Sequence, residues 1–147
     1  MALPPLRTDG TLPPGLHQIA NLNELFVVFP AGAAQRQSLD AELRRFVDVV
    51  QRRGLGVLLG IDGSYTTGKA APHDIDLVML SPGLVASTIE QQLQAEGIDI
   101  AQALDLWIEA TQIGFDGWVQ FFSTPRQRGG STRGVVLLPL TTITPGA

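Results

Sequence analysis

The chain has 147 residues and a formal net charge of −4, from fourteen acidic and ten basic residues. This length fits one domain with a buried core, and 44% hydrophobic with 16% charged residues is typical of a globular protein. The acidic balance argues against general binding of duplex DNA. Cysteine is absent and only two histidines are present, which excludes thiolate metal sites and argues against an all-histidine zinc site.

Membrane and export signals are missing from the sequence pattern. No apolar run approaches the roughly 18–20 residues that a membrane-spanning helix requires. The first ten residues contain no continuous apolar segment of the kind that a signal peptide has. We therefore expect a cytoplasmic protein without a membrane partner.

The first half of the chain predicts an extended segment followed by two helices. Four prolines and two glycines in residues 1–20 predict an N-terminal arm ahead of a single domain over 21–147. Asn21 and Glu24 have the spacing of a capping box, which predicts a short helix that ends at Pro30. Apolar residues three and four apart predict a second helix over 35–53, ended by Gly54.

The second half alternates strands and helices. Continuous apolar runs predict buried strands over 57–61 and 75–80, joined by a loop over 62–73. The order of elements predicts an α/β (α+β) fold with one mixed sheet and helices mainly on one face. The remaining expected elements are a helix over 84–95, a strand over 103–110, a helical turn or strand over 118–122, and a last strand over 134–140.

The loop at 62–77 has two incompatible interpretations, of which the first is a P-loop. Gly63 through Lys69 spells G-x-x-x-x-G-K after a strand. However, Ala70 stands where a serine or threonine would bind magnesium, and Pro72 falls where a helix should begin. A phosphate at this loop would therefore lack both the metal ligand and the helix N-terminus.

The second interpretation is metal-assisted phosphoryl-type transfer. Asp74 and Asp76 are two residues apart, so on a strand they point to one face, about 6.6 Å apart along the chain. Carboxylates so placed can share magnesium ions, and without a cation they repel each other. Gly63 permits close approach of the backbone to a phosphate, and Ser64 can donate a hydrogen bond to it. The alternative is a pair of solvated aspartates at the end of a strand.

Gly-Ser, a spacer that contains glycine, and Asp-Ile-Asp-Leu together resemble the signature of the DNA polymerase β-type nucleotidyltransferase superfamily. Within it, the chain resembles small bacterial nucleotidyltransferase-like proteins grouped as a domain of unknown function. The likeness extends over most of the chain, and only 62–77 is specific enough to count as a motif. The matching segments are Leu12–His17, Asp62–Thr67, Pro72–Asp76, the pair Phe121 and Phe122, and the pair Arg133 and Gly134.

This resemblance implies transfer of a nucleoside monophosphate from a nucleoside triphosphate to an acceptor hydroxyl on RNA or protein. Asp74, Asp76 and a third carboxylate would hold two divalent ions, Mg²⁺ or Mn²⁺, with Asp105 preferred over Asp99 and Glu109. The alternative for Asp105 is a solvated strand residue. Gly63 and Ser64 would seat the phosphates, and Lys69 would assist them. The superfamily commonly has an arginine after Gly-Ser, and the residue here is Tyr65.

Candidate acceptor and partner contacts lie near the C-terminus. Arg126, Arg128 and Arg133 form a basic cluster without acidic neighbours, which is either a polyanion contact, for example to tRNA, or a solvated loop. Trp107, Trp118, Phe121 and Phe122 are expected to be core residues or anchors for a homodimer or another partner, in preference to the alternative of a base-stacking platform. The resemblance also implies a toxin–antitoxin or phage-defence context. The alternative function is a catalytically silent binding module of the same fold, such as an antitoxin-like subunit.

Overall fold

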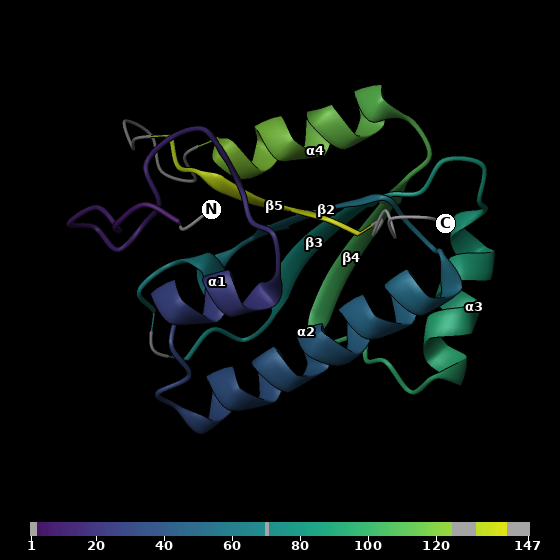
Figure 1. Cartoon of the computed structure of the whole chain (residues 1–147), viewed down its shortest axis with the longest axis horizontal. Coiled ribbons are helices and arrows are strands. Elements are labelled where there is room, and N and C mark those ends of the chain that lie inside the picture. Colours follow the sequence, from purple (N-terminus) through teal and green to yellow (C-terminus); the bar gives the residue numbers. More distant parts are fainter. Residues whose placement is uncertain (1–2, 70, 125–131, 141–147) are drawn as a thin grey trace, which may run out of the picture.

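The structure is a computed structural model of the chain, and it describes residues 3–69, 71–124 and 132–140 (Figure 1). Within these residues, no helix is long and apolar enough to cross a membrane. The helices are α1 (Leu22–Val28), α2 (Ala34–Arg53), α3 (Ala86–Ala95) and α4 (Gln112–Ser123), with a 3₁₀ turn η1 (Ser64–Thr66). The strands are β1 (Leu16–Gln18), β2 (Leu58–Asp62), β3 (Ile75–Leu80), β4 (Leu104–Glu109) and β5 (Val135–Pro139).

The five strands form one mixed sheet in the order β1-β5-β2-β3-β4. The central strand β2 is antiparallel to both β5 and β3, whereas β1 is parallel to β5 and β4 is parallel to β3. Parallel strands need a crossover connection, and α3 supplies it between β3 and β4. This architecture confirms the predicted mixed α+β fold.

Helices cover the two faces of the sheet unequally. In Figure 1, α1, α2 and α3 lie on one side of the sheet and α4 lies alone on the other. Consecutive residues of a strand point to opposite faces, so β3 contributes to both cores. Leu77 and Met79 belong to the larger cluster, together with residues of the first three helices. Val78 and Leu80 pack with Phe115 and other residues of α4 in the smaller cluster.

Helix boundaries follow the local signals in the first half of the chain and depart from them in the second. The capping box of Asn21 and Glu24 forms as predicted, and Gly54 ends α2 with φ +63°. In contrast, of the two alternatives predicted for 118–122 the helical one is confirmed and the strand is wrong, and the helical segment is longer than predicted, because α4 is a helix of 12 residues. Thr111 caps it by accepting a hydrogen bond from the backbone N–H of Gly114.

The N-terminal segment is built into the domain, although its prolines and glycines predicted only an extended arm. Part of it forms β1 beside β5, and Leu12 and Ile19 are buried in the larger core. Further upstream, the segment lies against the loop at 63–69. The N–H of Gly68 donates to the carbonyl of Gly10 at 2.8 Å, and a β-bridge joins Thr11 to Thr67. The segment therefore both extends the sheet and supports this loop.

Candidate active site

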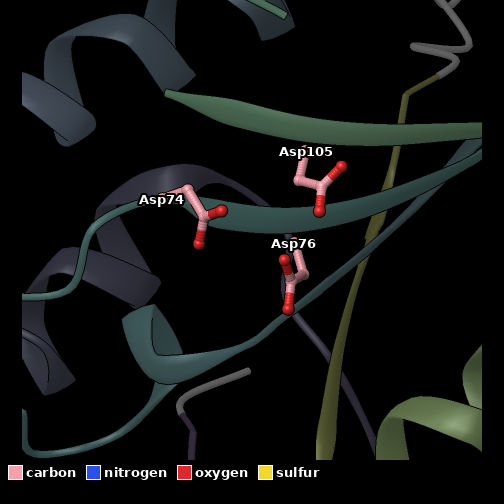
Figure 2. Close-up of side chains that lie close together, drawn as sticks. All are labelled: Asp74, Asp76 and Asp105. Atoms are coloured by element: carbon pink, nitrogen blue, oxygen red, sulfur yellow. The ribbon is translucent and has the colours of Figure 1, made fainter. Parts of the chain in front are cut away.

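Three carboxylates converge where β3 and β4 begin. Asp74 directly precedes β3, Asp76 lies within it, and Asp105 lies on β4. One carboxylate oxygen from each residue lies within 4.8 Å of the others. Figure 2 shows the three side chains gathered beside the two strands. The structure thus brings together the three residues that the sequence analysis selected.

Strand geometry explains this convergence. Asp74 and Asp76 are two residues apart, so their side chains leave the same face of β3. The parallel pairing of β3 with β4 places Asp105 directly beside Asp76. Val78 follows Asp76 by two residues and packs with α4, so the carboxylates lie on the face of the sheet that α4 covers.

The three carboxylates are close enough to repel one another. Asp74 and Asp76 are half-buried, and Asp105 is more exposed. Partial burial and, second, the neighbouring Asp74 carboxylate raise the pKa of Asp105 above its ordinary value of 3.8. Oxygen ligands from carboxylates are those that Mg²⁺ and Mn²⁺ prefer. The donor set therefore fits a hard divalent cation, which would also relieve the repulsion.

Gly63 is fitted to the site by its backbone conformation and by its missing side chain. It follows β2 with φ +85°, a conformation that favours glycine. A Cβ atom at this position would lie 2.7 Å from Oδ2 of Asp76. Such a contact is too short, so the loop can approach the carboxylate only because residue 63 is glycine. Ser64 follows as the first residue of η1.

The carboxylates line a cleft of about 710 Å³ that has two chemically different sides. One side is polar and consists of Ser64, Lys69, Asp74, Asp76 and Asp105. The other side comes from β4 and the end of α4 and consists of Trp107, Phe121, Phe122 and Thr124. Lys69 is the only cationic residue among the described residues that line this cleft.

Behind the loop, α2 provides a buried brace that the sequence analysis missed. Arg36 is only 4% exposed and donates to three backbone carbonyls of the loop. These bonds reach Tyr65 at 3.0 Å, Thr67 at 2.7 Å, and Lys69 at 2.8 and 3.0 Å. The Tyr65 hydroxyl donates to Asp40, which lies one turn after Arg36 on the same helix. The signal available in the sequence for this brace was a pair of opposite charges four residues apart, in a helix that also contributes core residues.

Tyr65 has a structural role in this brace. Its ring is fully buried, and the Arg36 guanidinium lies over it, 5.2 Å from the ring centroid. Burial and, second, the hydrogen bond to Asp40 raise the pKa of Tyr65, so the hydroxyl stays protonated. Burial likewise raises the pKa of Asp40, and the Tyr65 hydrogen bond opposes this effect. Tyr65 is therefore turned toward α2, away from the cleft.

The alternative third carboxylates have other contacts. Asp99 accepts backbone hydrogen bonds from Ala101 and Gln102, and Glu109 accepts one from the Trp118 indole at 2.9 Å. Neither belongs to the carboxylate cluster found among the described residues. Within the described part of the chain, Asp105 is thus the carboxylate that joins Asp74 and Asp76.

Of the three predicted acceptor contacts, the structure places only one. The Arg133 guanidinium donates to the fully buried Asp62 carboxylate at 3.3 Å and to the Phe122 carbonyl at 3.4 Å. Asp62 is paired with Asp76 in the β2–β3 register, so Arg133 lies near the carboxylate site. Arg126 and Arg128 lie outside the described residues.

Comparison with known proteins places the chain in a protein family. No curated protein and no solved structure was found to match the chain. The sequence profile of a family of unknown function, DUF6932, matches residues 4–139. This range includes the N-terminal segment, the loop, the three carboxylates and all five strands. The chain therefore belongs to the family of unknown function DUF6932.

Proposed function

We propose that the protein is a metal-dependent nucleotidyltransferase, which moves a nucleoside monophosphate from a nucleoside triphosphate to an acceptor hydroxyl on RNA or protein. The observation that carries this proposal is the meeting of three carboxylate oxygens within 4.8 Å, in a cleft that Ser64 and Lys69 also line. The close approach of Gly63 to Asp76 supports it, because the loop and the carboxylates then form one site.

Asp74, Asp76 and Asp105 would hold Mg²⁺ or Mn²⁺, which when bound supplies charge neutralisation of the triphosphate and activation of the acceptor hydroxyl. Ser64 donates its hydroxyl hydrogen to a phosphate oxygen, and the missing side chain of Gly63 leaves room for that phosphate. Lys69 contributes a positive charge from the same loop. Arg36 positions this loop from behind without reaching the substrate.

The negative charge of the cleft should oppose the binding of a nucleotide unless a cation is present. Three carboxylates face one lysine among the described lining residues. The end of α4 also lines the cleft, but the Arg133 guanidinium donates to the Phe122 carbonyl in its last turn and offsets the helix dipole there, so the carboxylates are the main source of repulsion. A triphosphate is itself a polyanion. Its binding should therefore depend on a divalent cation.

Calorimetry with ATP in the presence of Mg²⁺, Mn²⁺ or EDTA tests the proposal. We expect the wild type to bind ATP only with a divalent cation, and Asp74→Asn and Asp76→Asn to lose this gain. Asp48→Asn is the matched control, since Asp48 is an exposed aspartate on α2 whose partner is Arg52. Equal ATP binding by all four proteins, with and without metal, would overturn the two-metal hypothesis.

Turnover separates the enzyme from a silent module of the same fold. Incubation with α-labelled nucleoside triphosphate and Mg²⁺ should transfer label to total RNA or to a protein acceptor, and Asp76→Asn should abolish this transfer. Metal-dependent binding without any transfer would favour the catalytically silent binding module. The toxin–antitoxin or phage-defence setting remains part of the proposal and would be supported by labelling of tRNA or of a partner protein.

A further inference from the structure

The aromatic side of the cleft is separated from the carboxylates by about the length of one nucleoside. Trp107 follows Asp105 by two residues on β4, so both side chains leave the same face of the strand, about 6.6 Å apart along it. Both residues line the same cleft. A ligand with phosphates at Asp105 would therefore have its next group, beyond a ribose, close to the Trp107 ring.

Trp107 is held in place by the residues behind it. Its ring centroid lies 4.6 Å from that of Trp118 and 6.0 Å from that of Phe122. Trp118 is itself fixed by the hydrogen bond from its indole N–H to Glu109. A ring fixed in this way loses little conformational entropy when a planar ligand stacks on it.

Phe121 adds an exposed ring on the same side. It is 61% exposed and it lines the cleft. Its ring makes an edge contact with Trp118 at a centroid distance of 5.7 Å. Exposed aromatic surface beside a polar cluster is typical of ligand sites, where an apolar wall binds one part of a ligand and polar groups bind another.

We propose that Trp107 and Phe121 bind the nucleobase of the nucleoside triphosphate by stacking. This inference rests on the proposed function, and it identifies the substrate class of the same site. On this side, the described lining residues offer only two polar side-chain groups: the Thr124 hydroxyl, which already donates to the carbonyl of Gln120, and the single N–H donor of the Trp107 indole. Recognition by stacking area therefore dominates, so purine nucleotides bind more tightly than pyrimidine nucleotides, and ATP and GTP bind alike.

Calorimetry with Mg²⁺ and four probes, namely ATP, GTP, UTP and inorganic tripolyphosphate, tests this assignment. Stacking on an aromatic side chain accounts for about a 5-fold to 150-fold change in affinity per base. We expect Trp107→Ala to weaken ATP and GTP within that range and to leave tripolyphosphate affinity unchanged. Phe121→Ala, which alters an exposed ring, should weaken ATP less. Ile113→Ala is the control, because Ile113 is 86% exposed on α4 and does not line this cleft.

Fluorescence gives a second readout that does not depend on a loss of stability. Both tryptophans of the chain belong to this aromatic cluster. In Trp118→Phe, which retains only Trp107, ATP with Mg²⁺ should quench the emission and tripolyphosphate should not. Trp107→Phe should retain most of the ATP affinity that Trp107→Ala loses.

The possible failures are distinguishable. If the wild type binds ATP and tripolyphosphate equally, or if Trp107→Ala weakens both equally, the base does not contact these rings and only the stacking proposal falls. If neither probe binds with Mg²⁺, the proposed function falls, and the stacking proposal falls with it. A strong preference for ATP over GTP would overturn recognition by stacking area.

Discussion

Acidic side chains lie on both sides of the loop at 63–69, and their environments differ in burial and in hydrogen bonding. On the α2 side, Asp40 is buried, accepts the Tyr65 hydroxyl and lies near Arg36. On the cleft side, Asp74 and Asp105 are more accessible, and with Asp76 they have carboxylate oxygens within 4.8 Å of one another. Successive residues of the loop face these two environments, since Ser64 lines the cleft and Tyr65 is buried in the brace.

This contrast distinguishes the residues that stabilise the loop from the residues that would bind a ligand beside it. Buried polar groups stabilise a fold only when their hydrogen bonds are made, and the Arg36 brace meets that condition. Like charges close together destabilise the fold, and they persist where a ligand needs them. We therefore expect substitutions in the brace to reduce stability, and substitutions in the cleft to change ligand binding with small effects on stability.

The largest expected effect is that of Arg36→Met. The substitution leaves three loop carbonyls without these hydrogen bonds and removes the guanidinium from the Asp40–Tyr65 pair. Breaking a buried charged network in this way costs about 3–5 kcal/mol of unfolding free energy. Urea unfolding followed by circular dichroism measures it. Arg36→Lys keeps the charge but cannot reach three carbonyls at once, so its loss should be intermediate. A loss below about 1 kcal/mol for Arg36→Met would contradict the brace.

Gly63→Ala should have the next largest effect. We expect it to reduce both the stability of the fold and the binding of ATP in the cleft. The residue must keep φ +85°, which costs about 1–3 kcal/mol for a residue with a side chain. Gly83→Ala is the matched control, because Gly83 has φ +76° and no atom within 4 Å of an added Cβ. Both variants should lose stability in urea. Only Gly63→Ala should also lose ATP binding with Mg²⁺, since its Cβ meets Asp76. Equal ATP affinities for the two variants would contradict the importance of the close approach.

Ser64→Ala and Lys69→Ala compare two residues of one loop on the cleft side. Ser64→Ala should weaken ATP binding by about 1–3 kcal/mol, the range for a hydrogen bond to a charged group. Lys69→Ala should weaken it less, because its charge is exposed to solvent. Calorimetry at one Mg²⁺ concentration measures both. The reverse ranking, with Lys69→Ala much the weaker binder, is what a P-loop would give.

Asp105→Asn should have the smallest effect, and its sign is positive. The pKa of Asp105 is raised in the folded state, so between the ordinary value of 3.8 and the raised value the folded chain binds more protons than the unfolded chain. Stability therefore falls as pH rises through that interval, and asparagine removes this loss. In EDTA at pH 7 we expect a gain of at most about 1 kcal/mol, given solvent screening.

The gain from Asp105→Asn should disappear as the pH falls to the ordinary aspartate value, where the wild-type carboxyl is also protonated. Thermal unfolding across this pH range follows the difference. Addition of Mg²⁺ should then reverse the order of stability, because the cation stabilises the wild type by binding to the folded state only. Asp116→Asn, an exposed change on α4, should show neither trend. A pH-independent difference would contradict the role assigned to the carboxylate.

Local signals predicted most elements of the fold, and pairing between distant segments decided the rest. The capping box at Asn21 and Glu24 and the end of α2 at Gly54 follow from local chemistry. For α4, the glycines at 114 and 117 lower helix propensity, by about 1 kcal/mol each relative to alanine. Packing of Phe115 and neighbouring apolar residues against the sheet stabilises the helix nevertheless.

The candidate site also combines features that the local sequence predicts with features that depend on contacts between distant segments. The spacing of Asp74 and Asp76 was sufficient to place their side chains on one face. Asp105 falls within the strand that was predicted over 103–110, but only the parallel β3–β4 register brings it beside Asp76. The pair of charges at Arg36 and Asp40 is visible in the sequence, but nothing near it indicates that Tyr65 lies against these two residues. That contact depends on how α2 packs on the sheet.

The position of β4 at the edge of the sheet links the carboxylates to the folding of that edge. Asp105 reaches the site only when β4 pairs with β3, and this pairing depends on the long connection through α3. Edge strands open locally more readily than central ones, and here the repulsion between carboxylates favours opening. A cation shared by Asp76 and Asp105 would connect β3 to β4 and stabilise their pairing. Amide hydrogen exchange in β4 would then report the occupancy of the metal site.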